Sequence, residues 1–408
     1  MTGLPDGWRS ARLDDIAHVT LGQSPPGNTY NSDGRGAPFF QGKSEFTATY
    51  AEVRKYTTAG TKFAAAGDIL ISVRAPVGPT NIAPVDCAIG RGLAGLRAEN
   101  GLNQRYLFWA LRATEHKLAS QGAGSTFPAV TGKQLKSHRI NVAPLDEQRR
   151  IVDILEDYLS RLDAAGQSLA AAQRRSELLR AAILESLAPE GTPQRTLGEL
   201  ASDSGYGTST KCVVGGAGVP VVRIPNLKGG RVDLADEKRV SEAAVDLTRL
   251  MLEADDLLIV RTNGSRDLIG RAAVVQPGVF ASFASYLIRF RLDPPQVRPQ
   301  WTRVMLGTPS VRRVVEAMAA SSAGQYNLGL KKLNGVTIPC PTIEDQDRLL
   351  ARFDEQEWAL DSLTPSWAEG KSKAQSLRRS LLAAAFSGRL TGRSSDLEVA
   401  EELAAAEV

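Results

Sequence analysis

The sequence of 408 residues contains a long internal repeat. Residues 135–187 match residues 333–385 without a gap when they are moved forward by 198 positions, so that Leu135 meets Leu333 and Gln148 meets Gln346. A solenoid repeats a unit of only a few dozen residues, whereas this unit is nearly half of the chain. The repeat therefore predicts two domains of similar build, which offer two similar surfaces to one elongated target.

The halves upstream of this repeat match more loosely. Residues 67–74 parallel residues 255–261, and both read as an acidic turn, a short buried strand and a final arginine. Each half continues with a loop, a second apolar strand, a helix-like stretch and a Gly/Ser-rich loop. We therefore expect two mixed α/β domains that share a scaffold and differ in their loops.

Composition excludes several classes of protein. The formal net charge of +4 is only mildly basic, and three distant cysteines encode neither a disulfide framework nor a metal cluster. No apolar run reaches the ~20 residues that a membrane span requires. The start of the chain lacks the apolar core of a signal peptide. We expect a cytoplasmic protein without a membrane partner.

Catalytic motifs are incomplete. Residues 293–296 read Asp-Pro-Pro-Gln, so they lack the aromatic ring with which a base methyltransferase grips a flipped base. Residues 22–29 and 37–44 each lack one essential residue of a phosphate-binding loop. The three histidines show no metal-ligand spacing. We expect a non-catalytic chain without a metal or cofactor of its own.

Basic residues of the second half fall in loops that also carry amides and hydroxyls. A solvated surface would explain any one of them, but the mixture is the one needed to hold phosphates and read base edges. The basic members are Lys211, Arg223, Lys228, Arg231, Arg261, Arg266 and Arg271, beside Asn226, Thr262, Asn263 and Ser265.

The element that follows each domain carries a heptad seam. Residues 144–150 have the proline and first-turn acids of a helix start. Beyond them apolar positions alternate by four and three, the spacing with which one helix packs along another. The second copy is poorer, because Gln356 and Gly370 take seam positions and Pro365 falls inside the run. We expect a break or kink near Pro365 and a milder irregularity at Gly166. The proposed interface residues are Ile151, Leu155, Leu162, Leu169, Leu179, Leu349, Phe353, Leu360, Leu377 and Leu381.

Each seam could pack on its own domain, but the presence of two matching seams in one chain favours packing of the two helices against each other. If residues 145–187 formed one straight helix, it would span roughly 65 Å at ~1.5 Å per residue. We expect such a pair of helices to act as a ruler between the two domains.

The ordered motifs resemble those of type I restriction–modification DNA specificity subunits over essentially the whole chain. They are residues 38–46 (PFFQGKSEF), 67–76 (GDILISVRAP), 144–148 (PLDEQ), its partner 343–346 (IEDQ), 324–328 (GQYNL) and 377–390 (LRRSLLAAAFSGRL). Each fragment alone is weak, but the set in this order is specific.

The resemblance implies an architecture. Two globular target recognition domains would occupy residues 1–143 and 190–340, and two long helices forming an antiparallel coiled coil would lie at 144–189 and 341–388. Residues 389–408 would form a tail, and the acidic, alanine-rich composition of residues 396–408 predicts a small docking helix there. The first half departs from the pattern at residues 125–128 (STFP), where the second half has Gln-Tyr-Asn-Leu, so the two loops should read different bases.

The resemblance also implies partners and a role. Each domain would read one half of a bipartite site in double-stranded DNA, and two methyltransferase subunits would dock on the helices. Restriction subunits would complete the complex, with S-adenosylmethionine, ATP and Mg²⁺ on the partners. The alternatives are a specificity subunit of a related methyltransferase or phage-defence system, and a coiled-coil adaptor that never touches DNA. The candidate DNA-binding residues are Gln23, Ser24, Tyr30, Gln41, Lys43, Arg74, Thr126, Lys133, Thr210, Lys211, Arg223, Asn226, Arg261, Asn263, Arg266, Gln325, Tyr326 and Lys331.

Overall fold

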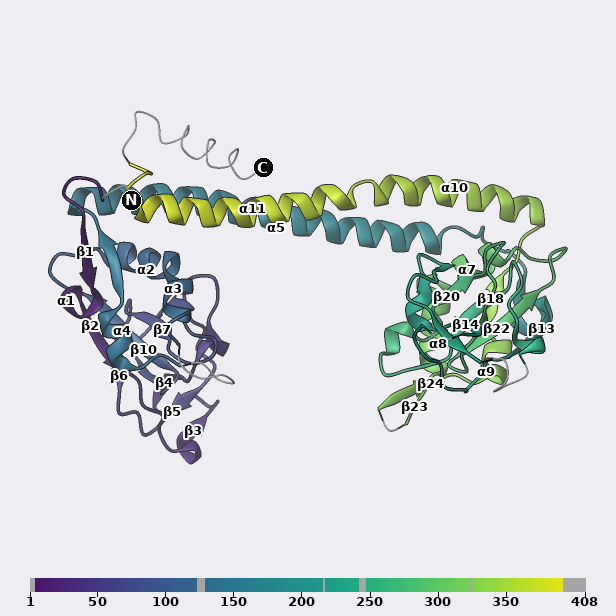
Figure 1. Cartoon of the computed structure of the whole chain (residues 1–408), viewed down its shortest axis with the longest axis horizontal. Coiled ribbons are helices and arrows are strands. Elements are labelled where there is room, and N and C mark those ends of the chain that lie inside the picture. The colour runs from purple at the N-terminus through teal and green to yellow at the C-terminus, as the bar shows by residue number, and fades with distance from the viewer. Residues whose placement is uncertain (1–3, 123–128, 216, 242–246, 323, 392–408) are drawn as a thin grey trace. The chain divides into compact units, whose positions relative to one another are not determined.

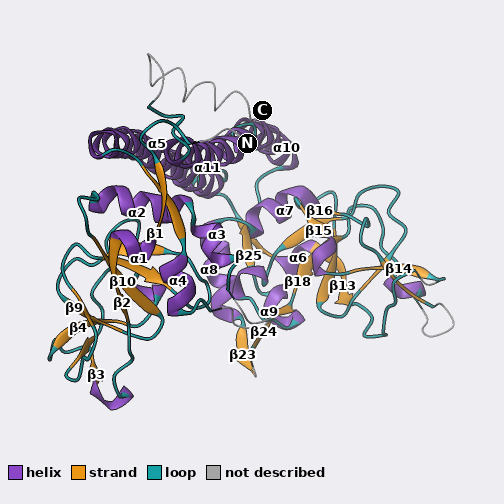
Figure 2. Ribbon diagram, turned by 60° about the vertical axis from the view of Figure 1, so that its left-hand side comes forward, coloured by secondary structure: helices purple, strands orange, loops and turns teal. Residues whose placement is uncertain are grey.

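The computed structural model describes residues 4–122, 129–215, 217–241, 247–322 and 324–391. The chain divides into unit 1, Met1–Ala170 with Ala368–Val408, and unit 2, Ala171–Trp367 (Figure 1). Strands and short helices alternate in both units, as the colouring of Figure 2 shows. The predicted mixed α/β class with long helices is confirmed.

Unit 1 contains a four-stranded antiparallel sheet of order β2-β10-β7-β8 and a five-stranded sheet of order β3-β5-β4-β9-β6. Strands β1 and β11 pair separately and lead into the first long helix. The elements are β1 (Arg9–Arg12), α1 (Leu13–Ile16), β2 (Ala17–Leu21), β3 (Tyr30–Asn31), β4 (Ala37–Phe40), β5 (Tyr56–Thr57), β6 (Phe63–Ala64), β7 (Ile69–Ser72), β8 (Thr80–Ile82), β9 (Cys87–Ile89), β10 (Leu93–Ala98), α2 (Gln104–Ala113), α3 (Glu115–Ala119), α4 (Gly132–Ser137) and β11 (Arg139–Val142).

Unit 2 repeats this plan around a six-stranded sheet of order β13-β22-β18-β20-β16-β15. Two three-stranded sheets, β17-β14-β21 and β19-β24-β23, and the pair β12-β25 complete it. The elements are β12 (Gln194–Thr196), α6 (Leu197–Leu200), β13 (Ala201–Tyr206), β14 (Val219–Val222), β15 (Leu227–Lys228), β16 (Arg231–Val232), β17 (Lys238–Val240), β18 (Leu257–Val260), β19 (Thr262–Asn263), β20 (Ala272–Val274), β21 (Ser282–Phe283), β22 (Leu287–Leu292), α7 (Pro299–Leu306), α8 (Pro309–Met318), β23 (Ala320–Ser322), β24 (Gln325–Asn327), α9 (Leu330–Asn334) and β25 (Thr337–Pro339).

The acidic turn before the first core strand has the same role in both units. Asp68 accepts a hydrogen bond from the backbone N–H of Ala65 at 2.8 Å and one from Arg97 Nε at 2.8 Å. In unit 2, Asp256 accepts a hydrogen bond from Arg291 Nε at 3.0 Å and one from the backbone N–H of Glu253 at 2.8 Å. Because each carboxylate joins its turn to the neighbouring strand, the start of the core strand is fixed in the same way in both units.

The repeated glutamine at the start of each long helix is also structural. Gln148 accepts from the N–H of Asn103 at 2.9 Å and donates to the carbonyl of Ala143 at 2.8 Å. Gln346 accepts from the N–H of Arg298 at 2.8 Å and donates to a backbone carbonyl at 2.9 Å. Both side chains are buried. Each therefore joins the long helix to the helix-like stretch of its own unit and satisfies backbone groups that burial would otherwise leave unpaired.

The first long helix, α5 (Leu145–Glu185), is continuous, so Gly166 does not interrupt it. The second is divided into α10 (Ile343–Asp361) and α11 (Thr364–Phe386). Pro365 is the second residue of α11, a position where proline costs no hydrogen bond. The predicted break near Pro365 is confirmed.

The helices pair in an antiparallel sense. Within unit 1, Asn141 donates to the carbonyl of Phe386 at 2.9 Å, farther along α5 Asp163 pairs with Arg378, and Leu169 lies opposite Gly370. The second helix thus runs backwards along the first. Within unit 2, Arg180 of α5 forms ion pairs with α10.

Seam residues at the domain-proximal ends contact both a helix and a domain. Ile151 and Leu155 are fully buried in the unit 1 core together with Leu381. Leu349 and Phe353 are buried in the unit 2 core. Both alternatives for the seam are therefore correct, because the same residues pack on their own domain and on the partner helix. Leu360 is also buried, and Leu162, Leu169 and Leu377 are half-buried.

Leu179 is a correction, because its side chain is 52% exposed. A regular α-helix drifts by about 20° per heptad relative to a strict heptad repeat, so four heptads move a seam residue roughly 80° around the helix. Arg180, Ile183 and Leu184 take the inward face there instead.

Candidate nucleic-acid interface

A groove of about 730 Å³ in unit 2 gathers polar side chains from several loops. Three of the predicted DNA-binding residues, Arg223, Asn263 and Gln325, line it. Lys228, Thr262 and Arg271 of the basic loops also line it, and Tyr286 and apolar residues complete its walls. Guanidinium, amide and hydroxyl groups therefore share one concave surface.

Two short strands place the amides. Thr262 and Asn263 form β19, which pairs with β24 so that Asn263 lies opposite Tyr326. The Oδ1 of Asn263 accepts from the N–H of Ser265 at 2.8 Å and holds the turn. Its Nδ2 and the side chain of Gln325 bond to none of the described residues. These groups are available to a base edge.

Arg261 supports this edge from behind. Its Nη2 donates to Asn327 Oδ1 at 2.8 Å, its Nη1 donates to the carbonyl of Ser285 at 3.1 Å, and its guanidinium lies 4.9 Å from the ring centre of Tyr206. Three contacts fix the side chain. We interpret Arg261 as a residue that positions β24.

Arg223 and Asn226 belong to one loop, and contacts with that loop hold both side chains. Arg223 donates from Nη2 to the carbonyl of Asp236 at 2.5 Å, and its buried Nε has no partner among the described groups. Asn226 is 1% exposed, accepts from the N–H of Arg223 and donates to the carbonyls of Asp233 and Asp236. Asn226 is therefore a correction, because its amide holds the loop and does not face solvent.

The remaining candidates of unit 2 do not line the groove. Lys211 and Lys331 are exposed, whereas Thr210 and Tyr326 are half-buried. Arg266 is exposed and donates to the carbonyl of Glu316 at 3.1 Å. Sequence reasoning missed Tyr286, which reads as the start of an apolar strand. Burial raises the pKa of its hydroxyl, so it reaches the groove as a neutral donor and acceptor.

In unit 1, Gln23, Ser24 and Gln41 meet around the turn at residues 90–92. The N–H of Gln23 donates to the carbonyl of Ile89 at 2.9 Å, and Ser24 Oγ accepts from the N–H of Arg91 at 3.1 Å. A Cβ on Gly92 would lie 2.6 Å from the carbonyl oxygen of Gln41, so this approach requires glycine.

The other candidates of unit 1 stand on separate elements. The hydroxyl of Tyr30 donates to the carbonyl of Pro25 at 2.9 Å. Lys43, Arg74 and Lys133 are exposed. Thr126 lies outside the described residues, as do residues 125–128 and the tail helix expected over 396–408.

The described parts of the chain contain no group of three or more His, Cys, Asp or Glu residues that could hold a metal ion. No helix in them is long and apolar enough to cross a membrane. His138 is buried against Thr114 Oγ1 at 3.0 Å, and burial lowers its pKa.

Comparison with known proteins points to one family. Residues 5–172 match the family model described as the type I restriction modification DNA specificity domain. The MjaX type I restriction enzyme specificity subunit of Methanocaldococcus jannaschii is 40% identical over 156 residues, which cover 38% of this chain and 37% of that subunit. The StySPI specificity subunit of Salmonella potsdam is 23% identical over 326 residues, which cover 76% of this chain and 70% of that subunit.

Solved structures share the fold. A chain from work on complex assembly and conformational transition of the type I R-M system gives a TM-score of 0.75 at 22% identity, covering 96% of this chain and 100% of the other. The HsdS subunit of Thermoanaerobacter tengcongensis gives 0.55 at 21% identity, covering 95% and 99%. The chain is thus similar to type I restriction–modification specificity subunits over most of its length.

Proposed function

We propose that this chain is the non-catalytic DNA-recognition subunit of a type I restriction–modification complex, in which each unit reads one half of a bipartite site. The observation that carries the proposal is the unit 2 groove, where Arg223, Asn263 and Gln325 meet on one concave surface. The similarity to type I specificity subunits supports the same conclusion.

The groove has the chemistry of direct base readout. An Asn or Gln amide can bond an adenine edge twice, and an arginine can bond a guanine edge twice. Lys228 and Arg271 at the same surface supply charges for phosphates, which position the protein without reading sequence. Because unit 1 carries different residues around its own turn, its half-site should differ.

The remaining parts of the complex follow from the family. Two methyltransferase subunits would dock on the long helices, whose repeated ion pairs offer each of them a similar surface. S-adenosylmethionine, ATP and Mg²⁺ would be bound by the methyltransferase and restriction subunits, all in the cytoplasm.

The test is DNA binding by the chain in complex with its methyltransferase. The substrate is a duplex whose site has been identified by mapping methylated bases. Asn263→Ala and Gln325→Ala should weaken discrimination at the unit 2 half-site by about 10- to 100-fold, since a bidentate amide–base pair contributes ~1–3 kcal/mol. Gln300→Ala, an exposed amide outside the groove, is the matched control. Unchanged discrimination in both groove variants would refute the assignment of the groove.

A further inference from the structure

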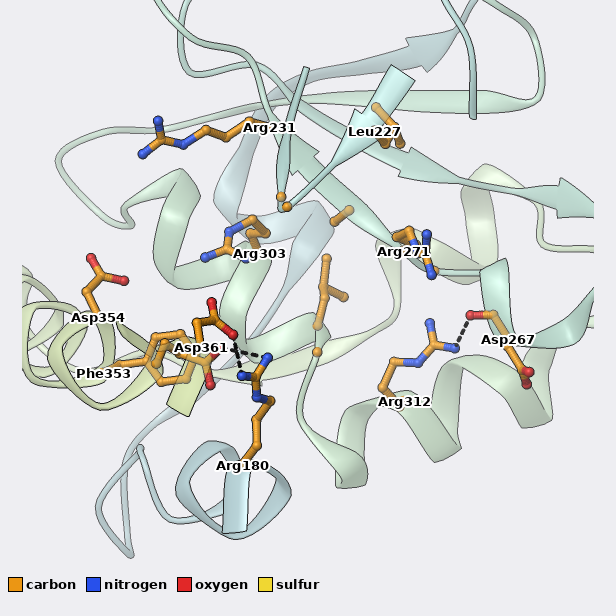
Figure 3. A pocket seen from close by; sticks show the side chains of 17 residues that line it. Arg180, Leu227, Arg231, Asp267, Arg271, Arg303, Arg312, Phe353, Asp354 and Asp361 are labelled. Carbon is orange, nitrogen blue, oxygen red and sulfur yellow. Dashed lines mark hydrogen bonds and ion pairs between the residues drawn. The ribbon is translucent and has the colours of Figure 1, made fainter. Parts of the chain in front are cut away.

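Unit 2 has a second cavity, of about 650 Å³, where its globular part meets α5 and α10. Arginines reach it from five places in the fold (Figure 3). They are Arg180 of α5, Arg231 of β16, Arg271 before β20, Arg303 of α7 and Arg312 of α8. DNA reading as proposed above uses the groove and does not explain this cavity.

Two of these arginines have partners within the chain. Arg180 forms ion pairs with Glu357 at 3.3 Å and with Asp361 at 2.6 Å, and Arg312 forms one with Glu316 at 2.8 Å. No described residue forms a hydrogen bond or ion pair with the side chains of the other three. Arg303 is half-buried, and burial lowers its pKa.

The acidic side of the cavity is also incompletely satisfied. Glu357 Oε2 pairs with Arg180, but Glu357 Oε1 is buried and has no hydrogen-bond partner among the described groups. Asp354 lines the same wall and makes no ion pair with Arg303. The cavity therefore has arginines without partners on one side and the carboxylates of Asp354 and Glu357 on the other.

The internal repeat allows the residues that line this cavity to be compared with their counterparts in unit 1. The hydrogen bonds of Gln148 and Gln346 align Asn103 with Arg298, and this register places Phe108 opposite Arg303. The long-helix register places Leu159 opposite Glu357. Phe108 and Leu159 are both buried in the unit 1 core. Unit 2 therefore has an arginine and a glutamate where unit 1 has a phenylalanine and a leucine.

The acidic residue at position 354 of this wall also differs from its counterpart in unit 1, because it lacks that residue's hydrogen-bond donors. In unit 1, Glu156 accepts from Arg105 at 2.7 Å and from Trp109 Nε1 at 3.0 Å. Its counterpart Asp354 has neither donor, because Gln300 and Val304 stand at those two positions. Four differences between repeat-related positions thus leave polar groups without partners at one place.

Arg231 and Arg271 are exposed, whereas the half-buried Arg303 and the buried Oε1 of Glu357 lower stability when they have no partner. An apolar arrangement at the corresponding positions is present in unit 1. Such groups cluster where a protein binds a ligand. The volume lies within the ~300–1,000 Å³ typical of small-molecule sites. The arginines without partners suit a phosphate, and the carboxylates of Asp354 and Glu357, which line the same cavity, suit an N–H donor of a base.

We propose that this cavity is a binding site for a nucleoside phosphate. The phosphate lies against Arg303 and Arg231, and an N–H of the base donates to Glu357. The site is separate from DNA reading, although Arg271 also lines the groove. For that reason the test avoids Arg271.

The test is calorimetric titration of the full chain with GTP, ATP and inorganic phosphate in separate experiments. At least one nucleotide should bind more tightly than inorganic phosphate. The double variant Arg303→Phe with Glu357→Leu copies unit 1 and should weaken that binding at least tenfold. Arg352→Ala, an exposed arginine of α10, should leave it unchanged.

Thermal unfolding of each variant separates loss of the site from loss of the fold. Arg303→Gln and Glu357→Gln, which keep polar side chains, serve as second variants and should each weaken nucleotide binding. Three results would overturn the proposal: no nucleotide binding, inorganic phosphate bound as tightly as the nucleotides, or nucleotide binding that survives the double variant.

Discussion

Arg180 donates a hydrogen bond to Asp361 at 2.6 Å, and the repeat-related Arg378 makes the same ion pair with Asp163. Each unit thus joins α5 to the other long-helix element through the same two residue types. Exposed ion pairs contribute only about 0–1 kcal/mol each, so they select the register of the helices more than they stabilise it. The stability of the pairing comes from the buried leucines.

The first prediction concerns those leucines. Changing Leu162 and Leu360 together to aspartate should separate the helices, because Leu360 is buried and Leu162 is half-buried. We expect a loss of roughly 2–5 kcal/mol at Leu360, the range for losing a core leucine, a smaller loss at Leu162, and loss of co-purification with the methyltransferase. Leu178→Asp, at a site that is 66% exposed, is the control and should keep the complex. A double variant that still co-purifies would mean that the paired helices are not the docking surface.

The second prediction concerns pH. Burial raises the pKa of Glu357 in the folded chain. A raised folded pKa favours folding while the carboxyl is protonated, and this contribution is lost as the pH rises through the folded pKa. Glu357→Gln is neutral throughout, so it should raise the unfolding temperature more at about pH 7 than at about pH 4.

Glu355→Gln, at an exposed site on the same helix, is the control for the pH experiment. It should change the unfolding temperature little at either pH. An equal effect of Glu357→Gln at both pH values would show that burial of this carboxyl does not affect stability.

The third prediction concerns the gap between half-sites. Leu169 lies opposite Gly370, where a Cβ would be 3.5 Å from Leu169 Cδ2. Four residues inserted after Leu169 and four before Gly370 should keep the pair in register and lengthen it by about 6 Å. At ~3.4 Å per base pair the gap should grow by one to two base pairs, with both half-sites unchanged. Mapping of methylated bases measures the gap, and an active variant with the original gap would show that helix length does not set it.

The sequence predicted the parts of the fold that repeat without a gap. The offset that aligns Gln148 with Gln346 gave both helix starts, and Pro365 gave the break between α10 and α11. Leu179 was misplaced because the heptad count took no account of the drift of a regular helix.

The sites were harder to predict because they depend on loops. In the sequence, Asn226 looks like an amide that reads a base. Only the folded loop shows that its side chain is buried and bonded to backbone groups of the same loop. The correspondence between Phe108 and Arg303 was hidden because the offset that aligns the two copies changes ahead of the long helices. The cavity could therefore not be found by sliding the sequence along itself.

The central claim is that the two units read separate half-sites, and exchange of one unit tests it most directly. Residues 1–143 are replaced by the same region of a homologue, and methylated bases are mapped genome-wide in cells that carry the chimera. The account predicts a new sequence in one half of the site, with the other half and the gap unchanged. A site altered in both halves, or in neither, would contradict it.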